Sequence, residues 1–290
     1  VRRQDRRSGQ QNRIISGSFF RPDPAQFVQP AAGRLASRFG LRRYFNGEAR
    51  APHSGLDLAL ARGTPVGASF RVNSATTGSQ YESDVATHAD GSFVVTWRSD
   101  NQDGSGAGIY FQRFDASANK LGPETLANTL TASNQYEAKV GSLVGGGFVI
   151  VWRDDNGADG SGNAVFGQRF DAAGNKLGVE TRASTPVPAN PYIAEYEPAI
   201  ALLNDGSGDF VITWTDNTAD GSASGIFGQR FNADGSADGA SFRVNTYTDS
   251  SQGQSAVAAL GGGAFVVVWA SYGQDGSYQG IYGQRFDGAG

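Results

Sequence analysis

Four acidic loops carry the residue types in this sequence that could do chemistry. Each contains an Asp-Gly-Ser step. The aspartates of these steps, and those shortly before three of them, are Asp103, Asp159, Asp220 and Asp275, with Asp100, Asp155 and Asp216. Calcium takes about six to eight hard oxygen ligands from carboxylates, carbonyls and water, and an acidic loop containing glycine could supply several. The loops are therefore candidate calcium sites, and the last is the weakest because it has the fewest oxygen-bearing side chains.

The same loops can also be interpreted as plain turns. Asp and Ser side chains hydrogen-bond the backbone of a tight turn, and glycine takes the positive φ angle that such a turn requires. The spacing also differs from the alternating acidic pattern of an EF-hand loop. Turn formation is the favoured interpretation, with calcium as the alternative.

The elements that must position these loops form a repeat. Four tryptophans, each at the end of a Phe-Val-Val-Thr-Trp-like run, recur at nearly even intervals at Trp97, Trp152, Trp214 and Trp269. An Asp-Gly-Ser step and then a Gln-Arg-Phe step follow each tryptophan. A regular interval of this size is typical of a solenoid, a propeller or an array.

Each repeat predicts four short antiparallel strands. In the first repeat these cover 84–89, 92–97, 109–115 and 124–128, with an Asp-Gly turn joining the first two. The second strand is apolar at nearly every position, as expected of a strand buried on both faces, and the third should lie nearer the edge. Four antiparallel strands in about 50 residues make one propeller blade.

A repeated hexapeptide suggests how the array closes. Ala-Ser-Phe-Arg-Val-Asn occurs at 68–73 and again at 240–245, where it forms the fourth strand of the third repeat. The array thus begins with a lone fourth strand and ends after a third strand. The prediction is an all-β fold of four four-stranded repeats, a small β-propeller whose termini close the last blade. A piece cut from a longer array is the alternative.

The repeats resemble those of large, secreted, calcium-associated bacterial surface proteins of the RTX and adhesin kind. The resemblance covers 69–290 and lies in the Trp, Asp-Gly-Ser and Gln-Arg-Phe steps. It implies a secreted, cell-surface or periplasmic domain that binds, adheres or acts as a scaffold, stabilised by calcium, with a surface glycan or protein as partner. No catalytic residue is expected within it.

Two recurrent features could be read as a ligand site. The Gln-Arg-Phe steps begin at Gln112, Gln168, Gln229 and Gln284, and we expect them to make packing or blade-to-blade contacts. Tyr247, Tyr272 and Tyr278 lie in irregular segments and could contact a glycan or be ordinary surface residues. A glycoside-cleaving propeller would need paired carboxylates on one face, and no acidic pair stands out from the repeats.

The segment 1–68 has a different character. It holds 12 Arg and four acidic residues, a net charge of +8, whereas the remainder carries −12. Residues 1–18 are predicted to be a basic disordered tail, and most of the segment is expected to be irregular. Its arginines lack interleaved aromatic residues, so nucleic acid is not expected as a partner.

Residues 19–68 resemble the opening of a lysostaphin-like zinc endopeptidase that cuts peptidoglycan. The likeness is carried by 29–43, by Pro-His-Ser-Gly-Leu-Asp at 52–57 and by Gly-Thr-Pro-Val at 63–66. It implies that His53 and Asp57 are two of three protein zinc ligands. The third ligand comes from a later His-x-His motif, and the other histidine here, His88, does not match it. Two ligands argue against a working zinc site, so this peptidase is the alternative function and its domain is incomplete.

The composition excludes other classes. The chain has no cysteine, so it has neither a disulfide framework nor a thiolate nucleophile. Its longest apolar runs are much shorter than the roughly 20 residues of a membrane-spanning helix.

Overall fold

The computed structural model describes residues 68–132, 134–155, 162–184, 194–217, 221 and 223–288, together with the backbone of four short strands before residue 60. The chain divides into two compact units, Val1–Phe70 and Arg71–Gly290. In the first unit, β1 (Arg34–Ser37) pairs antiparallel with β4 (Asp57–Ala59), and β2 (Arg42–Phe45) pairs with β3 (Glu48–Pro52). Asp57 lies opposite Ser37 in this pairing. His53, the Asp57 side chain and the predicted tail at 1–18 lie outside the described residues.

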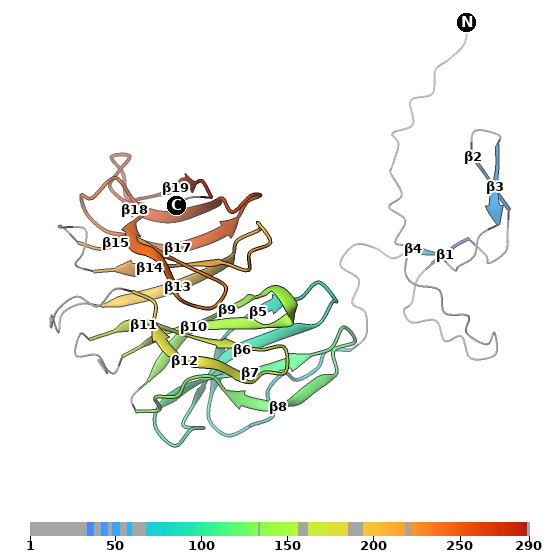
Figure 1. Cartoon of the computed structure of the whole chain (residues 1–290), viewed down its shortest axis with the longest axis horizontal. Coiled ribbons are helices and arrows are strands. Elements are labelled where there is room, and N and C mark those ends of the chain that lie inside the picture. The colour runs from blue at the N-terminus through green and yellow to red at the C-terminus, as the bar shows by residue number, and fades with distance from the viewer. Residues whose placement is uncertain are drawn as a thin grey trace, which may run out of the picture. The chain divides into compact units, whose positions relative to one another are not determined.

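The second unit consists of four antiparallel sheets, which we call blades 1 to 4 in chain order (Figure 1). Blade 1 contains β5 (Gln80–Thr87), β6 (Phe93–Asp100), β7 (Ala107–Phe114) and β8 (Lys120–Leu126). Blade 2 contains β9 (Gln135–Ser142), β10 (Phe148–Asp154), β11 (Ala164–Phe170) and β12 (Lys176–Arg182), with a 3₁₀ turn, Val144–Gly146, between its first two strands. Blade 3 contains β13 (Glu195–Leu202), β14 (Phe210–Asp216), β15 (Gly225–Phe231) and β16 (Ala237–Arg243). Blade 4 contains β17 (Gln252–Ala259), β18 (Phe265–Tyr272) and β19 (Gln279–Phe286).

The blades follow one another side by side, from blue-green at β5 to red at β19 in Figure 1. The first strands β5, β9, β13 and β17 are neighbours across successive blades, and the fourth strands lie at the other side of each sheet. This is the arrangement of propeller blades. The all-β prediction and its four repeats are confirmed.

Each blade packs on the next through a separate buried cluster. In the first cluster Ile109 and Phe111 of blade 1 pack with Phe148, Ile150 and Trp152 of blade 2. Two further clusters join blades 2 and 3 and blades 3 and 4 in the same way. Because both faces of blades 2 and 3 are covered, their second and third strands are buried at nearly every position. In blades 1 to 3 the third strand lies next to the outer, fourth strand, whereas the third strand of blade 4 is mostly exposed.

The prediction that the termini close the last blade is wrong for the described strands. Blade 4 has three strands, and β19 pairs with β18 alone among them. Residues 68–73 form no strand. Just after them, the carboxylate of Glu124 in blade 1 accepts the N–H of Ser74, and Lys120 Nζ lies 3.0 Å from Ser74 Oγ. Thr129 makes the same two contacts with Glu180 and Lys176 of blade 2, so these bonds are an ordinary contact between successive blades. The described strands are left open by β19, which lacks a fourth strand beside it.

Candidate functional site

A row of glutamates runs across the first strands of the blades. Glu82, Glu137 and Glu197 occupy the same place in β5, β9 and β13, where each strand bulges and the residue has φ between 54° and 57°. Gln254 takes this place in β17, with φ 59°. A bulge with one residue in the left-handed region turns the strand locally and re-aims its side chains. The four residues thus lie at the same end of neighbouring first strands.

Hydrogen bonds link this row from blade to blade. Glu82 Oε2 accepts the backbone N–H of Glu137 at 2.9 Å, and Glu137 Oε2 accepts that of Glu197 at 2.6 Å. Glu197 Oε2 accepts the N–H of Gln254 at 2.6 Å and the hydroxyl of Thr215 at 3.0 Å. Charge-assisted bonds of this kind are stronger than neutral ones. We call Glu82, Glu137, Glu197 and Gln254 the carboxylate row, although its last member is an amide.

Tyrosines and arginines surround the row in blades 1 and 2. The guanidinium of Arg98 lies 4.4 Å from the ring centre of Tyr81 and 4.3 Å from that of Tyr136. It also lies 3.1 Å from Asp100 Oδ1. Arg153 stacks on Tyr136 at 4.6 Å and pairs with Glu137 at 3.3 Å. Burial is the main cause that raises the pKa of the Tyr136 hydroxyl. At this end of blades 1 and 2 the tyrosine rings are therefore covered by guanidinium groups.

The pattern changes in blade 4 and leaves a groove. Gly253 stands where the other blades have Tyr81, Tyr136 and Tyr196, so blade 4 brings no tyrosine ring toward blade 3 from this position. The resulting groove has a volume of about 460 Å³. Its lining includes Tyr196, Glu197, Gln252, Gln254, Tyr272 and Gln279. We call it the blade 3–4 groove.

The groove combines an aromatic wall with hydrogen-bonding side chains. Tyr272 is exposed and stands edge-on to Tyr278, with ring centres 6.4 Å apart. Glu197 adds a carboxylate to the lining, and Gln254 and Gln279 add exposed amides. Amides both donate and accept, and a carboxylate accepts several bonds. This set suits a neutral ligand rich in hydroxyl groups.

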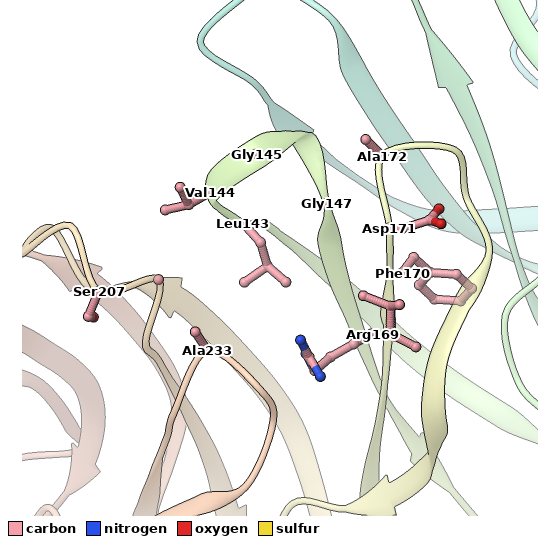
Figure 2. A pocket seen from close by; sticks show the side chains of 12 residues that line it. Leu143, Val144, Gly145, Gly147, Arg169, Phe170, Asp171, Ala172, Ser207 and Ala233 are labelled. Atoms are coloured by element: carbon pink, nitrogen blue, oxygen red, sulfur yellow. The ribbon is translucent and has the colours of Figure 1, made fainter.

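A second hollow, of about 250 Å³, lies at the other end of the blades and has a structural explanation (Figure 2). Its lining is largely apolar, with Leu143, Val144 and Ala233 around the side chain of Arg169. Figure 2 shows Arg169 extending toward the turn that carries Ala233. Its guanidinium donates to the carbonyl of Asp234 in blade 3. Arg169 is therefore engaged in holding two blades together.

The Gln-Arg-Phe steps make the contacts expected of them. Arg113 and Arg230 repeat the bond of Arg169, donating to the carbonyls of Ala172 and Gly288 in the following blade. The buried Gln112 donates to the carbonyls of Arg113 and Gly122, joining the third and fourth strands of its own blade. The prediction of packing and blade-to-blade contacts is confirmed for the first three steps, whereas Gln284 of blade 4 donates to the carbonyl of Arg285 in its own strand.

The acidic loops behave as turns wherever they are described. Asp103 Oδ1 accepts the N–H of Ser105 at 3.0 Å, and Asp275 Oδ1 accepts that of Ser277 at 3.0 Å. Asp155 accepts the backbone N–H of Asn134, Asp100 is paired with Arg98, and Asp216 ends β14. Asp159 and Asp220 lie outside the described residues. In the described part of the chain no group of three or more His, Cys, Asp or Glu side chains could hold a metal ion. Calcium binding at these loops stays a prediction.

Sequence reasoning missed the carboxylate row. Its signal was a Tyr-Glu step that occurs three times, at 81–82, 136–137 and 196–197, just before the predicted first strands. The bulge interrupts the alternation of side chains there, so the steps read as loop residues. Three glutamates recur at this position, one in each of the first three blades.

Comparison with known proteins gives structural neighbours only. No protein-family model and no curated protein matches the sequence. Among solved structures, an α-L-arabinofuranosidase from Fusarium graminearum in complex with an iminosugar inhibitor has a TM-score of 0.51 at 12% identity, covering 71% of this chain and 62% of its own. An α-L-arabinanase from Penicillium chrysogenum complexed with arabinobiose has a TM-score of 0.51 at 15% identity, covering 71% and 64%. A protein of unknown function from Dyadobacter fermentans has a TM-score of 0.50 at 12% identity, covering 82% and 65%.

This likeness establishes the β-propeller fold alone. The chain spans less than two thirds of the length of each of these three structures. The neighbours nevertheless correct the expected function. They include glycoside-cleaving enzymes, which overturns the expectation of an adhesive or scaffolding domain and that of a peptidoglycan endopeptidase. No helix in the described residues is long and apolar enough to cross a membrane.

Proposed function

We propose that this chain is a carbohydrate-active β-propeller that binds an oligosaccharide in the blade 3–4 groove. The observation that carries the proposal is the break in the repeat at Gly253, beside which the half-buried Tyr196 and Glu197 and the exposed Tyr272 line one hollow. Binding sites for small ligands are concave, with aromatic walls and a few convergent polar groups. The structural neighbours that act on arabinose-containing glycans suggest arabino-oligosaccharides as the first ligands to test.

Two features of the groove suit a sugar. The flat face of a pyranose or furanose ring packs on an aromatic side chain, and the exposed ring of Tyr272 offers such a surface. Vicinal hydroxyl groups need partners that both donate and accept, and the amides of Gln254 and Gln279 do so beside the carboxylate of Glu197. An uncharged ligand also avoids the cost of burying a second charge next to Glu197.

Binding is tested by calorimetric titration with arabino-oligosaccharides of increasing length. Tyr272→Ala removes the aromatic wall, whose stacking contributes about 1 kcal/mol, so we expect binding to weaken by about tenfold. The matched control is Tyr81→Ala, the same change at the same end of blade 1, and its affinity should equal that of the wild type. Equal affinity of the Tyr272→Ala variant and the wild type would contradict the assignment of the groove.

A second candidate function is cleavage of a glycosidic bond. The carboxylates of Glu137 and Glu197 lie on neighbouring first strands, since Glu137 Oε2 bonds the backbone of Glu197. Glycoside hydrolysis generally uses two carboxyl groups, one as acid and one as nucleophile or base. Glu197 reaches the groove and is the better candidate of the two.

Cleavage is tested by release of reducing sugar from arabinan. Glu197→Gln keeps an oxygen that can accept the N–H of Gln254, so the fold should survive while turnover falls by at least a hundredfold. Affinity for the oligosaccharide should change much less than turnover. No release of sugar by a wild-type sample that binds the ligand would show a binding domain and eliminate this candidate.

A further inference from the structure

The three junctions between blades are built from the same parts. On the apolar side, the equivalent residues Ile109, Val165 and Ile226 each pack against the next blade and are fully buried. On the polar side, an arginine from each third strand bonds a turn of the next blade, and the carboxylate row joins the first strands. A junction is thus a recurring unit with two different sides. We call the side given by the earlier blade, with its third strand and arginine, the tail side, and the side given by the following blade, with its first strand and turn, the head side.

An asparagine at the end of the fourth strand completes two of the junctions. Asn128 Oδ1 accepts the N–H of Ile109 at 2.9 Å, and Asn128 Nδ2 donates to Gln135 Oε1 at 3.0 Å. Asn245 makes the same two bonds, with Ile226 at 2.7 Å and Gln252 at 3.0 Å. Each asparagine therefore ties the third strand of its own blade to the first strand of the next.

The beginning of blade 1 carries one half of such a junction. Asn73 Nδ2 lies 3.2 Å from Gln80 Oε1, as Asn128 and Asn245 lie beside Gln135 and Gln252. Residues 71–73 thus have the position of a fourth strand that would serve a blade before blade 1. On the same side Val85 is 57% exposed, whereas its equivalent in blade 2, Val140, is 6% exposed.

The end of blade 4 carries the other half. Ile281, the equivalent of the buried Ile109, Val165 and Ile226, is 78% exposed. Val268 is 39% exposed, whereas its equivalents Thr96 and Val151 are fully buried. Among the described strands β19 has one neighbour, so its outer edge presents backbone groups that a fourth strand would pair. Blade 4 keeps the apolar residues of a junction without a blade to cover them.

We propose that a second copy of this chain docks head to tail on blade 4. Residues 71–73 of the second copy add to β19 as its fourth strand, in the register by which Arg243 pairs with Phe227 and Arg182 with Phe166. That register sets Arg71 opposite Tyr282 and aligns Asn73 Oδ1 with the N–H of Ile281. Strand addition of this kind is held by main-chain bonds, and side chains set its specificity.

A second copy fits because the two ends of this chain complement each other: blade 4 of one copy meets blade 1 of the other. Blade 1 supplies the asparagine and the first-strand glutamine that two of the three junctions have, together with an apolar face. Arg285 of blade 4 would bond the turn after β7, as Arg113, Arg169 and Arg230 bond theirs. A head-to-tail contact leaves one free end of each kind, so copies can close into rings or extend into chains.

The register is tested by cysteine pairing, since the chain has no cysteine of its own. One variant carries Arg71→Cys and another carries Tyr282→Cys. Mixed and oxidised, they should give a disulfide-linked dimer on non-reducing gels, and either variant alone should not. The internal control places cysteines at Phe227 and Arg243 of one chain, whose Cα atoms are already paired.

Two outcomes of this experiment overturn the proposal. The first is that the control disulfide between positions 227 and 243 forms, while the mixture of Arg71→Cys and Tyr282→Cys gives no linked dimer. The second is seen with both cysteines on one chain: formation of a monomeric loop at low concentration would show that the two ends meet within a single molecule.

A second measurement asks whether the contact holds copies together in solution. The mass from sedimentation velocity should rise above that of a single chain as the concentration increases. Ile281→Asp should weaken association at least tenfold without changing the melting temperature, because this residue is exposed in the single copy. Val179→Asp is the matched control, since Val179 is 79% exposed on an outer strand. A wild-type mass that stays at the single-chain value over the whole concentration range would contradict the proposal.

Discussion

Single side chains in this protein act mainly on backbone groups. Glu82, Glu137 and Glu197 accept main-chain N–H groups of the next blade, while the arginines of the Gln-Arg-Phe steps donate to main-chain carbonyls there. These side chains bond main-chain groups of the next blade where two sheets meet without sharing a ladder. The residues that recur most regularly are therefore those of the junctions. The blade 3–4 groove lies where that regularity ends.

His88 provides a prediction at this scale. Its Nδ1 atom is buried without a hydrogen-bond partner, and burial lowers the pKa of the imidazole, with the Asp90 carboxylate opposing the shift. The folded state disfavours the charged ring. The contribution of the neutral His88 ring to stability is therefore complete above about pH 6.5 and is lost as the pH falls through the lower folded pKa.

The measurement compares the free energy of unfolding of the wild type and His88→Gln from pH 8 to pH 5. The difference between them should stay constant above pH 7 and shift in favour of the variant below pH 6.5. Carboxylates that titrate in both proteins cancel in this difference. A difference that does not change with pH would show that folding does not lower the pKa of His88.

At the scale of elements, the turns between third and fourth strands depend on the arginine of the preceding blade. Gly174 has φ +84°, and a methyl group added there would lie 2.8 Å from Nε of Arg113. Gly206 has almost the same angle, φ +85°, with nothing within 4 Å of such a group. Comparing an alanine substitution at each glycine therefore distinguishes the cost of backbone strain from the cost of disturbing the contact between blades.

We expect Gly206→Ala to cost about 1 kcal/mol through the left-handed conformation alone. Gly174→Ala should cost about 1 kcal/mol more, since Arg113 must move away from the carbonyl of Ala172. Urea denaturation measures both. In an Arg113→Met background the extra cost should disappear, and its persistence there would show that the arginine is not its cause.

Prediction from sequence worked best for the second strands. Trp97, Trp152, Trp214 and Trp269 lie in β6, β10, β14 and β18, because an apolar run buried on both faces has a clear pattern. The first strand of blade 1 was predicted to start at Asp84, whereas β5 starts at Gln80. The bulge at Glu82 shifts the side-chain alternation by one residue, which hides the beginning of the strand and with it the carboxylate row.

Over the whole molecule, burial depends on neighbours that the local sequence does not reveal. Ile226 and Ile281 occur in nearly identical segments, Gly-Ile-Phe-Gly-Gln-Arg-Phe and Gly-Ile-Tyr-Gly-Gln-Arg-Phe, yet the first is buried and the second is exposed. Their difference comes from position in the array alone. For this reason the open end of blade 4 could not be predicted, and the repeated hexapeptide was taken to close the ring. The blade 3–4 groove could not be predicted either, because it depends on one residue, Gly253.

The use of main-chain partners at every junction has an evolutionary consequence. An arginine that bonds a carbonyl, and a glutamate that bonds an N–H, place almost no demand on the side chain of the bonded residue, and the three carbonyls belong to Ala172, Asp234 and Gly288. Gene duplication or unequal recombination could therefore insert, delete or exchange a blade without a compensating change in its neighbours. The same tolerance leaves the individual blade free to diverge, as blade 4 has done with Gly253 and Gln254 in place of Tyr and Glu.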